Sequence, residues 1–344
     1  MADQIAAEPP PESYVTLSRE DRLAALGVAA TVSGRAAHLL EKDIWVVWAL
    51  QGLFESELGE HLVFKGGTSL SKGYDIIQRF SEDVDLTYDV RQIIPELVTG
   101  NPPLPANNSQ AKKWTETARE RLKTWVKDTA LPVLEQHAKA TGADVTFRVE
   151  GDVIYIDYDQ LAKGTGYVPP SVKLEFGARS TGEPAETRDI SCDAAPFVSG
   201  VSFPTAAPRI MLPKRTFWEK ATAVHVFCLQ GLEEGDRLSR HWHDLVRLDD
   251  AGIADEALAD SALAREVADW KSKFFRARDR DGNPINYHAA VTGGLQLVPD
   301  EVTRKELEAD YKKMAEDGIL PDDAEPFDEL MKRCEQLQQR ANSR

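Results

Sequence analysis

Two adjacent glycines between short apolar segments constrain the fold of this chain more than any other feature of its sequence. His61–Phe64 is predicted to be a strand that stops at Gly66 and Gly67, and Ser81–Tyr88 is predicted to be a second strand. Between them, Ser69–Gln78 has the pattern of a short helix. Glycine lacks a Cβ and therefore allows backbone angles that a side chain would forbid. We expect a strand, a tight turn, a helix and a second strand in immediate succession.

The rest of the chain shows helical patterns on both sides of this unit and strand-like segments after it. An apolar stripe at helical spacing runs from about Ser18 to Glu57, and a loop rich in proline and asparagine is expected over Thr99–Ser109. Gly151-Asp152 is a hairpin signal. The strand-like segments are Asp144–Glu150, Val153–Tyr158 and Ser171–Phe176, and further helices are expected over Trp114–Lys139, Thr216–Leu229, Arg240–Leu248, Ala257–Phe275 and Thr303–Glu316.

This order of elements predicts an α+β protein, with a mixed sheet flanked by helices and followed by a mostly helical C-terminal part. A flexible lead-in is expected over residues 1–15, where three prolines follow one another. Residues 16–210 are expected to form the core. Residues 211–344 are expected to form a helical domain that completes the cleft, with the boundary near Pro208–Pro213.

The charge balance limits the partners of the chain. Its 344 residues include 41 Lys and Arg against 57 Asp and Glu, which leaves a formal net charge of −16. A surface of that sign argues against broad, salt-driven wrapping of nucleic acid or of an anionic membrane, although a local basic cleft remains compatible with it. We expect no DNA partner and no membrane partner.

Cysteine usage and hydropathy indicate a reduced, cytoplasmic protein. The three cysteines, Cys192, Cys228 and Cys334, lie far apart and have no paired spacing, so neither a disulfide framework nor a zinc knuckle is indicated. No apolar run approaches the roughly 18 residues of a membrane span, and the first residues lack the basic and apolar regions of a signal peptide.

The glycine turn and the second predicted strand together carry a pattern suited to phosphate chemistry. A helix that begins just after Gly66 and Gly67 directs free N–H groups and a positive dipole end at an anion. Asp83 and Asp85 lie two residues apart on the strand and therefore project from one face. Paired carboxylates suit Mg²⁺, which usually arrives with nucleotide phosphates. Alone, the glycines could be an ordinary turn and the aspartates a solvated face, but their succession favours nucleotidyl transfer.

Three stretches also resemble a known family. FKGGTSLSKGYDIIQRFSEDVDL resembles the first motif of the DNA polymerase β-like nucleotidyltransferase superfamily, in the version carried by the AbiEii/AbiGii toxin family. LPKRTFWEKATAVHVF resembles a later helix of that family, in which a lysine follows a glutamate, and SRHWHDLVRL resembles its arginine–aromatic–aspartate–leucine element. The resemblance covers roughly residues 35–250 and implies a nucleotidyltransferase fold.

The resemblance also implies roles for individual residues. Lys220 would contact the triphosphate, and Asp244 would line the same cleft. Glu175 is the best candidate for a third carboxylate, where the family often has aspartate. The phosphate-binding turn would consist of Gly66, Gly67, Thr68 and Ser69, and the metal ligands would be Asp83, Asp85 and Glu175.

Several of these residues have plainer interpretations. Lys220 lies at the edge of an apolar helical stripe and could snorkel to solvent, and Asp244 could be a cap or a solvated residue. Two basic segments with aromatic neighbours could hold an RNA backbone or could be solvated helix faces. These segments contain Lys112, Lys113, Arg119, Arg121, Lys123 and Lys127, and Lys271, Lys273, Arg276, Arg278 and Arg280.

The resulting hypothesis is a Mg²⁺-dependent nucleotidyltransferase, with Mn²⁺ as the alternative ion. It would transfer an NMP from an NTP to an acceptor hydroxyl, with release of pyrophosphate. The resemblance implies a toxin of a toxin–antitoxin or phage-defence system, with a cognate antitoxin and the 3′ end of a tRNA as the leading acceptor. The alternatives are NMPylation of a protein hydroxyl, and a catalytically idle nucleotide-binding or interaction module on the same fold.

Overall fold

A seven-stranded mixed sheet organises the N-terminal part of the protein. The computed structural model describes residues 11–79, 81, 83–100, 102–164, 169–232, 238–316, 318–321 and 324–343. The strand order is β4-β5-β6-β3-β2-β11-β7, in which β3 pairs with β6, and β2 with β11, in parallel, while the other neighbours are antiparallel. These strands are β2 (Leu62–Lys65), β3 (Asp83–Tyr88), β4 (Val145–Glu150), β5 (Val153–Tyr158), β6 (Ser171–Gly177), β7 (Ala185–Thr187) and β11 (Arg209–Met211).

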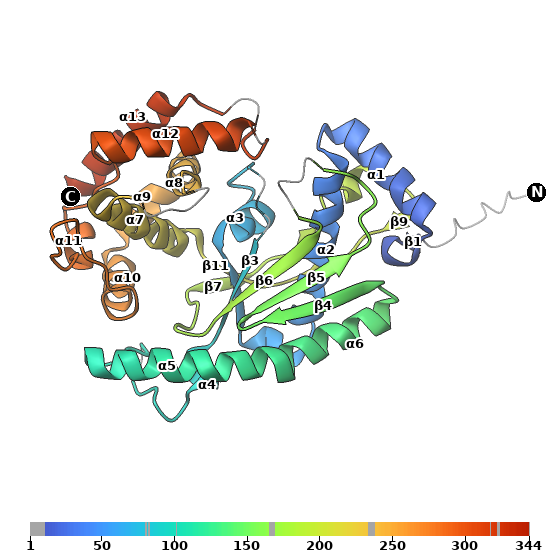
Figure 1. Ribbon diagram of the computed structural model, residues 1–344, viewed down its shortest axis with the longest axis horizontal. Coiled ribbons are helices and arrows are strands. Elements are labelled where there is room, and N and C mark those ends of the chain that lie inside the picture. The colour runs from blue at the N-terminus through green and yellow to red at the C-terminus, as the bar shows by residue number, and fades with distance from the viewer. Residues whose placement is uncertain are drawn as a thin grey trace, which may run out of the picture.

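Helices cover this sheet (Figure 1), and the first hydrophobic core lies between the helices and the sheet. Trp45 and Trp48 of α2 are buried against it, whereas α5, a π-helical turn at Val126–Ala130 and α6 form one continuous rod. The covering helices are α1 (Arg19–Ser33), α2 (Ala37–Phe54), α3 (Gly66–Tyr74), α4 (Val90–Ile93), α5 (Asn108–Trp125) and α6 (Leu131–Thr141), with 3₁₀ turns at Tyr14–Thr16, Glu57–Glu60 and Ala195–Phe197.

The C-terminal part is helical and has a second core. That core contains Trp218, Trp242 and Leu330, and it also takes in Leu70 and Ile77 from α3 and the segment that follows it. In Figure 1, α3 accordingly lies between the sheet and the C-terminal helices. These helices are α7 (Pro213–Gln230), α8 (Arg240–Asp250), α9 (Ile253–Ala259), α10 (Ser261–Phe274), α11 (Tyr287–Ala290), α12 (Glu301–Glu316) and α13 (Phe327–Asn342).

The predicted α+β architecture is confirmed, and so is the succession of strand, glycine turn, helix and strand. Two elements differ from expectation. The helix expected over Ala257–Phe275 is interrupted, because the carboxylate of Asp260 accepts a hydrogen bond from the backbone N–H of Leu263 and caps a new helix. Helix α13 was not predicted, although Phe327, Leu330, Met331, Cys334 and Leu337 have helical spacing and are buried.

The end of the expected lead-in also differs. Residues 1–10 lie outside the described part, but Glu12–Ser13 forms strand β1, which pairs in parallel with β9 (Val201–Ser202). Tyr14 is fully buried and stacks on Phe203 at 5.2 Å between ring centroids. A second small sheet joins β8 (Ile190–Ser191) to β10 (Thr205–Ala206). The aromatic anchor at Tyr14 explains why the packed structure begins earlier than the proline run suggests.

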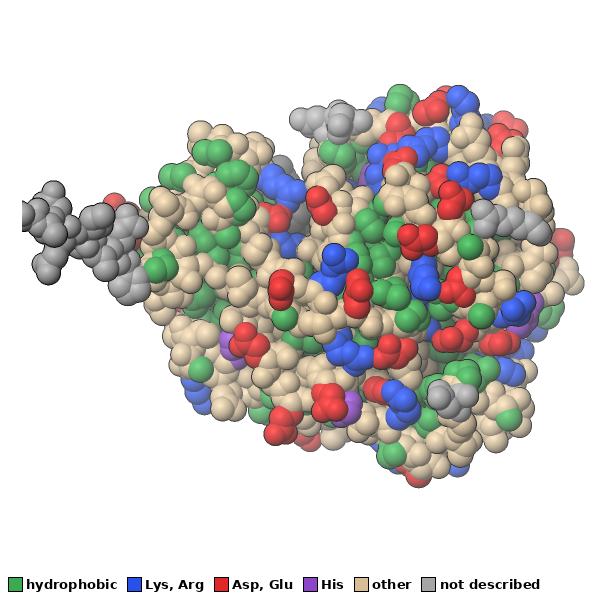
Figure 2. Space-filling model, turned by 180° about the vertical axis from the view of Figure 1, so that it is seen from behind, with side chains coloured by type: hydrophobic (Ala, Val, Ile, Leu, Met, Phe, Trp, Pro, Cys, Tyr) green, Lys and Arg blue, Asp and Glu red, His purple; other side chains and the backbone are tan. Residues whose placement is uncertain are grey.

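The surface carries mixed charge and one apolar helix face. On the face in Figure 2, acidic and basic side chains are interspersed over the helical part, and apolar side chains gather at the end that carries α1. Leu23, Val28 and Val32 of α1 are each more than 40% exposed. Within the described residues, no single helix is long and apolar enough to cross a membrane, and α1 and α2 reach that length only as a pair bent by 112°.

Candidate active site

A cavity of about 220 Å³ lies between the sheet and the C-terminal helices, and most of the predicted site residues line it. The sheet side contributes the ends of β2, β3 and β6 together with the first turn of α3. The helical side contributes α7, α8 and α10. Its charged and glycine lining residues are Lys65, Gly66, Gly67, Asp83, Asp85 and Glu175 on the first side, and Glu219, Lys220, Arg240, His241 and Lys271 on the second, with Arg79 beside them.

The two glycines at the start of α3 are required by close contacts. Gly66 has φ of +81°, a conformation that L side chains rarely adopt, and a Cβ there would overlap Oδ2 of Asp85. A Cβ on Gly67 would lie 2.5 Å from Nη2 of Arg79 and 2.8 Å from Oγ of Ser81. The first amides of a helix have no intrahelical acceptor, so this glycine turn leaves a helix N-terminus open toward the cavity.

Thr68 and Ser69 hold the turn from inside. Oγ1 of Thr68 lies 2.5 Å from the carbonyl oxygen of Asp83, to which it donates a hydrogen bond, and Oγ of Ser69 donates to the carbonyl of Gly66 at 2.9 Å. Both side chains are buried and do not line the cavity. Any contribution of these two residues to phosphate binding therefore comes from their backbone amides, and their hydroxyls fix the turn against β3.

Helix α3 is also anchored away from the cavity. Nζ of Lys72 lies 2.6 Å from Oδ1 of Asp43 and 2.6 Å from Oδ1 of Asp193. Burial lowers the pKa of Lys72, but these two carboxylates outweigh it and hold the pKa above its ordinary value. The ammonium group is therefore a permanent cation that ties α3 to α2 and to the segment after β8.

The three predicted carboxylates share one face of the sheet. Asp85 lies opposite Glu175 in the parallel pair β3–β6, and Asp83 is two residues before Asp85 on the same face, while Val84 is buried on the other face. Burial raises the pKa of Asp85, the charges of Glu175 and Asp83 raise it further, and Lys65 and Lys220 oppose the rise. This negative group, held close to the cavity, favours a cationic partner.

The carboxylate oxygens of the cavity are of the type that binds Mg²⁺, but they do not form a complete metal site by themselves. In the described ranges, no group of three or more His, Cys, Asp or Glu side chains is placed to hold a metal ion. Asp83 lies 3.8 Å from Nη1 of Arg240, and Glu175 forms an ion pair with Lys173. Mg²⁺ usually takes only one or two protein carboxylates and fills its other positions with water and substrate phosphates. Carboxylate oxygens of Asp83 and Asp85 fit that requirement.

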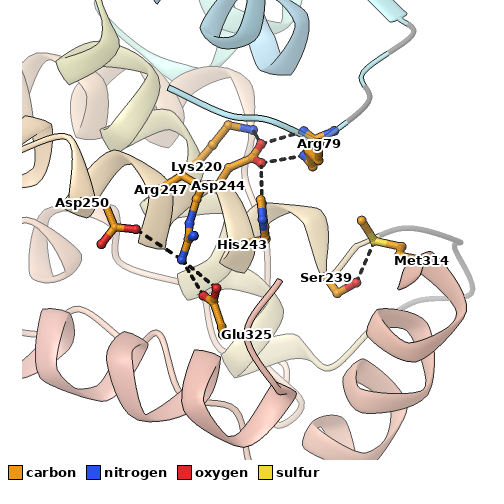
Figure 3. A network of polar contacts seen from close by, with 9 residues as sticks. All are labelled: Arg79, Lys220, Ser239, His243, Asp244, Arg247, Asp250, Met314 and Glu325. Atoms are coloured by element: carbon orange, nitrogen blue, oxygen red, sulfur yellow. Dashed lines mark hydrogen bonds and ion pairs between the residues drawn. The ribbon is translucent and has the colours of Figure 1, made fainter. Parts of the chain in front are cut away.

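Lys220 and Asp244 are joined in a buried ion network (Figure 3). Nζ of Lys220 lies 2.8 Å from Oδ2 of Asp244, and Arg79 donates to both carboxylate oxygens, at 2.6 Å from Nε and 2.7 Å from Nη2. Burial lowers the pKa of Lys220, against the opposing charge of Asp244. Burial raises the pKa of Asp244, but Arg79 and Lys220 outweigh it and hold that pKa well below its usual range.

The structure corrects the expected position of Asp244. Its side chain is 0% exposed and is absent from the cavity lining, so it lies behind Lys220 and orients that residue together with Arg79. The network continues on the far side, where Nδ1 of His243 lies 3.5 Å from Oδ1 of Asp244 (Figure 3). Asp244 is therefore a positioning residue, and Lys220 is the member of the pair that reaches the cavity.

Several residues that line the cavity were not predicted as site residues. The sequence signals that could have identified them differ. Lys65 and Glu219 each directly precede a residue that was singled out, and Arg240 and His241 lie inside the third family-like stretch. Lys271 was singled out only within a basic segment that could hold an RNA backbone or form a solvated helix face, and not as a residue of this cavity. It is only 9% exposed, and burial lowers its pKa to about 8, with partial opposition from Glu219.

The family of the chain follows from a sequence comparison that agrees with this geometry. The model of the AbiEii nucleotidyl transferase toxin family, of type IV toxin–antitoxin systems, matches residues 48–333. The chain belongs to this family. It is a nucleotidyltransferase, and membership implies an NTP substrate and a cognate antitoxin. No curated protein sequence matches it.

Three solved structures are similar to this AbiEii-family protein at low identity. JHP933 from Helicobacter pylori is 15% identical, over 89% of this chain and 92% of that one, with a TM-score of 0.41. MenT4, a nucleotidyltransferase toxin from Mycobacterium tuberculosis, is 16% identical, over 95% and 98%, with a TM-score of 0.39. A putative nucleotidyltransferase from H. pylori is 15% identical, over 88% and 94%, with a TM-score of 0.42.

Proposed function

We propose that this nucleotidyltransferase transfers a nucleoside monophosphate from a magnesium-bound NTP to the 3′-terminal hydroxyl of a tRNA. The observation that carries the proposal is one cavity lined by Asp83, Asp85, Glu175 and Lys220, with a helix N-terminus at its edge. In the reaction, the acceptor oxygen bonds to the α-phosphorus. The bond from that phosphorus to the α,β-bridging oxygen breaks, and pyrophosphate leaves.

The residues that bind the triphosphate are those with positive charge or free amides. The first turn of α3 supplies backbone N–H groups and the positive end of the helix dipole for the outer phosphates. Lys220 supplies an ammonium group that Asp244 holds in place at 2.8 Å. Arg79 donates to both oxygens of the same carboxylate, so Asp244 is fixed in position and orients Lys220 toward the cavity.

The carboxylates of β3 would hold the metal ion. Asp83 and Asp85 would be its protein ligands, Glu175 would be the third carboxylate, and Mn²⁺ is the alternative to Mg²⁺. When bound, the ion would neutralise charge on the phosphates and position them for in-line displacement. Glu175, opposite Asp85 on the same face, would take the proton of the acceptor hydroxyl as the new bond forms.

Basic side chains on α5, a helix that packs against the cavity-lining α10, support a nucleic-acid acceptor. Lys112, Lys113, Arg119 and Lys123 are exposed on α5, and α5 contacts α10, which carries Lys271. On a chain with a net charge of −16, such a cluster is suited to a polyanion. The enzyme would act as the toxin of a toxin–antitoxin or phage-defence pair, with modification of tRNA as the cause of toxicity.

The test is to incubate the protein with each α-labelled NTP, Mg²⁺, total bacterial RNA and lysate protein. The parent should label tRNA, and Asp83→Asn or Asp85→Asn should lower labelling by at least about 100-fold, because each removes a metal ligand. Asp189→Asn, at an exposed carboxylate, is the matched control and should label as the parent does. Equal labelling by the Asp85→Asn variant would contradict the assignment, and label on protein alone would replace tRNA with a protein acceptor.

A further inference from the structure

A series of cationic side chains leads from the cavity to a second hollow beside α5. Lys271 lines the cavity, and its Nζ lies 4.8 Å from the ring centroid of Phe275. Cζ of Arg179 lies 4.5 Å from the centroid of the same ring. Arg179 then lines a smaller cavity of about 100 Å³ together with Arg119 of α5. The series Lys271, Arg179 and Arg119 therefore begins in the active site and ends at the surface.

The charges of Glu219 and Asp152 act on Lys271 and Arg179, but from beyond ion-pair distance. In the part of the chain that the structure describes, none of the three cations takes part in an ion pair, and Asp152 is the one acidic residue that lines the smaller cavity. Other basic residues here are paired, as Arg121 is with Glu96 at 2.7 Å. Buried charges are normally paired, so the buried Lys271 and the half-buried Arg179, beside the exposed Arg119, suit an anion that the folded chain does not supply.

Packing contacts that join α10 to the end of β6 and to α5 hold these residues in place. The indole Nε1 of Trp270 donates to the backbone carbonyl of Arg179 at 3.1 Å, which ties α10 to the end of β6. Trp114 of α5 packs near Phe274 of α10, with ring centroids 6.3 Å apart. Burial lowers the pKa of Arg179, and the charge of Arg119 lowers it further, as expected for like charges held close together.

The series is separate from the ion network that orients Lys220. On α7, Lys220 pairs with Asp244 of α8, whereas the neighbouring Glu219 is influenced by Lys271 of α10 and Lys65. Lys220 of α7 and Lys271 of α10 thus bring two separate cations to the cavity that the carboxylates of β3 line. Nucleotidyl transfer brings together a triphosphate and an acceptor, so a second anion site in the same cavity suits a phosphodiester.

We propose that Lys271, Arg179 and Arg119 form a subsite for the phosphodiester backbone of a nucleic-acid acceptor near its reactive end. The inference rests on the proposed function and assigns acceptor-binding residues to it. Lys271 would contact the phosphate nearest the reacting hydroxyl, and Arg179 and Arg119 would contact those that follow, with the first two cations both packed on the ring of Phe275.

The experiment measures transfer to bulk bacterial tRNA by the full-length protein at several salt concentrations. The double variant Arg119→Gln with Arg179→Gln should raise KM for tRNA about tenfold and lower the slope of log KM against log salt by about one to two, because two phosphate contacts are lost. KM for the NTP and kcat at saturating tRNA should change less than about twofold.

The control is Lys139→Gln with Lys305→Gln, which removes the same charge from exposed sites on α6 and α12. It should keep the parental KM and salt slope. Arg119 is exposed, so Arg119→Gln alone retains the fold and should give a smaller change of the same kind. A double variant with the parental KM and salt slope would overturn the subsite. The subsite would also be overturned if the parent enzyme labelled only protein and no RNA. If the parent transfers label to no acceptor, the proposed function itself fails.

Discussion

At the scale of single residues, burial separates side chains that look alike in the sequence. Lys220 and Lys271 both line the cavity, but among the described residues only Lys220 forms an ion pair, with Asp244. Asp244 is buried and Asp85 is half-buried, and Arg79 and Lys220 hold the pKa of Asp244 low, whereas desolvation raises that of Asp85. The environment of each side chain, more than its type, determines whether it positions a neighbour or faces the substrate.

Lys271 should make the stability of the protein depend on pH in a specific way. Burial lowers its pKa to about 8 in the folded protein, against roughly 10.4 in an unfolded chain. Between these values the unfolded chain holds a proton that the folded protein has lost, so stability should rise with pH. Relative to Lys271→Met, the parent should gain roughly 1–3 kcal/mol of unfolding free energy from pH 7.5 to pH 10.

Urea unfolding at a series of pH values measures this difference. Lys139→Met, at an exposed lysine of α6, is the control and should stay at a constant difference from the parent. A constant difference for Lys271→Met as well would mean that the ammonium group of Lys271 is hydrated in the folded protein.

At the scale of elements, the glycine turn should be far more sensitive to substitution than a glycine in an ordinary helix. Gly66→Ala would place a Cβ against Asp85 at φ of +81°, and we expect a loss of more than about 1 kcal/mol of stability and of most NTP binding. Gly27→Ala in α1 meets nothing within 4 Å and should stabilise the protein by up to about 1 kcal/mol. Thermal unfolding and titration with Mg²⁺ and each NTP test both, and normal NTP binding by Gly66→Ala would contradict the role of the turn.

Elements with local signals could be predicted from the sequence, and those that depend on distant partners could not. The unit from β2 to β3 was predictable because glycines and alternating apolar residues mark its boundaries. Strands β7 and β11 are three residues each, and only their pairing with each other and with β2 makes them part of the sheet. The break at Asp260 escaped detection because apolar spacing continues across it. The position of Lys271 in the cavity could not be predicted for a related reason, since its burial depends on where α10 packs.

At the scale of the whole molecule, the active site is the place where two cores meet. Arg79, near the sheet, binds Asp244 of α8, and Leu70 of α3 is fully buried in the core of the C-terminal helices. Both contacts join the part that carries the carboxylates to the part that carries Lys220. The geometry of the cavity therefore depends on the two cores being folded at the same time.

This arrangement predicts that the two cores unfold together. Leu70→Ala would leave a void in the C-terminal core, and truncation of a buried leucine costs about 2–5 kcal/mol. Although Leu70 belongs to α3, amide protection should fall by a similar free energy in α2, which packs on the sheet, and in α8. Hydrogen exchange followed peptide by peptide measures this, with Leu23→Ala at an exposed position of α1 as the control that should leave both helices unchanged. Loss of protection in α8 alone would show that the sheet folds independently, and the cavity would then be a contact between two separate domains.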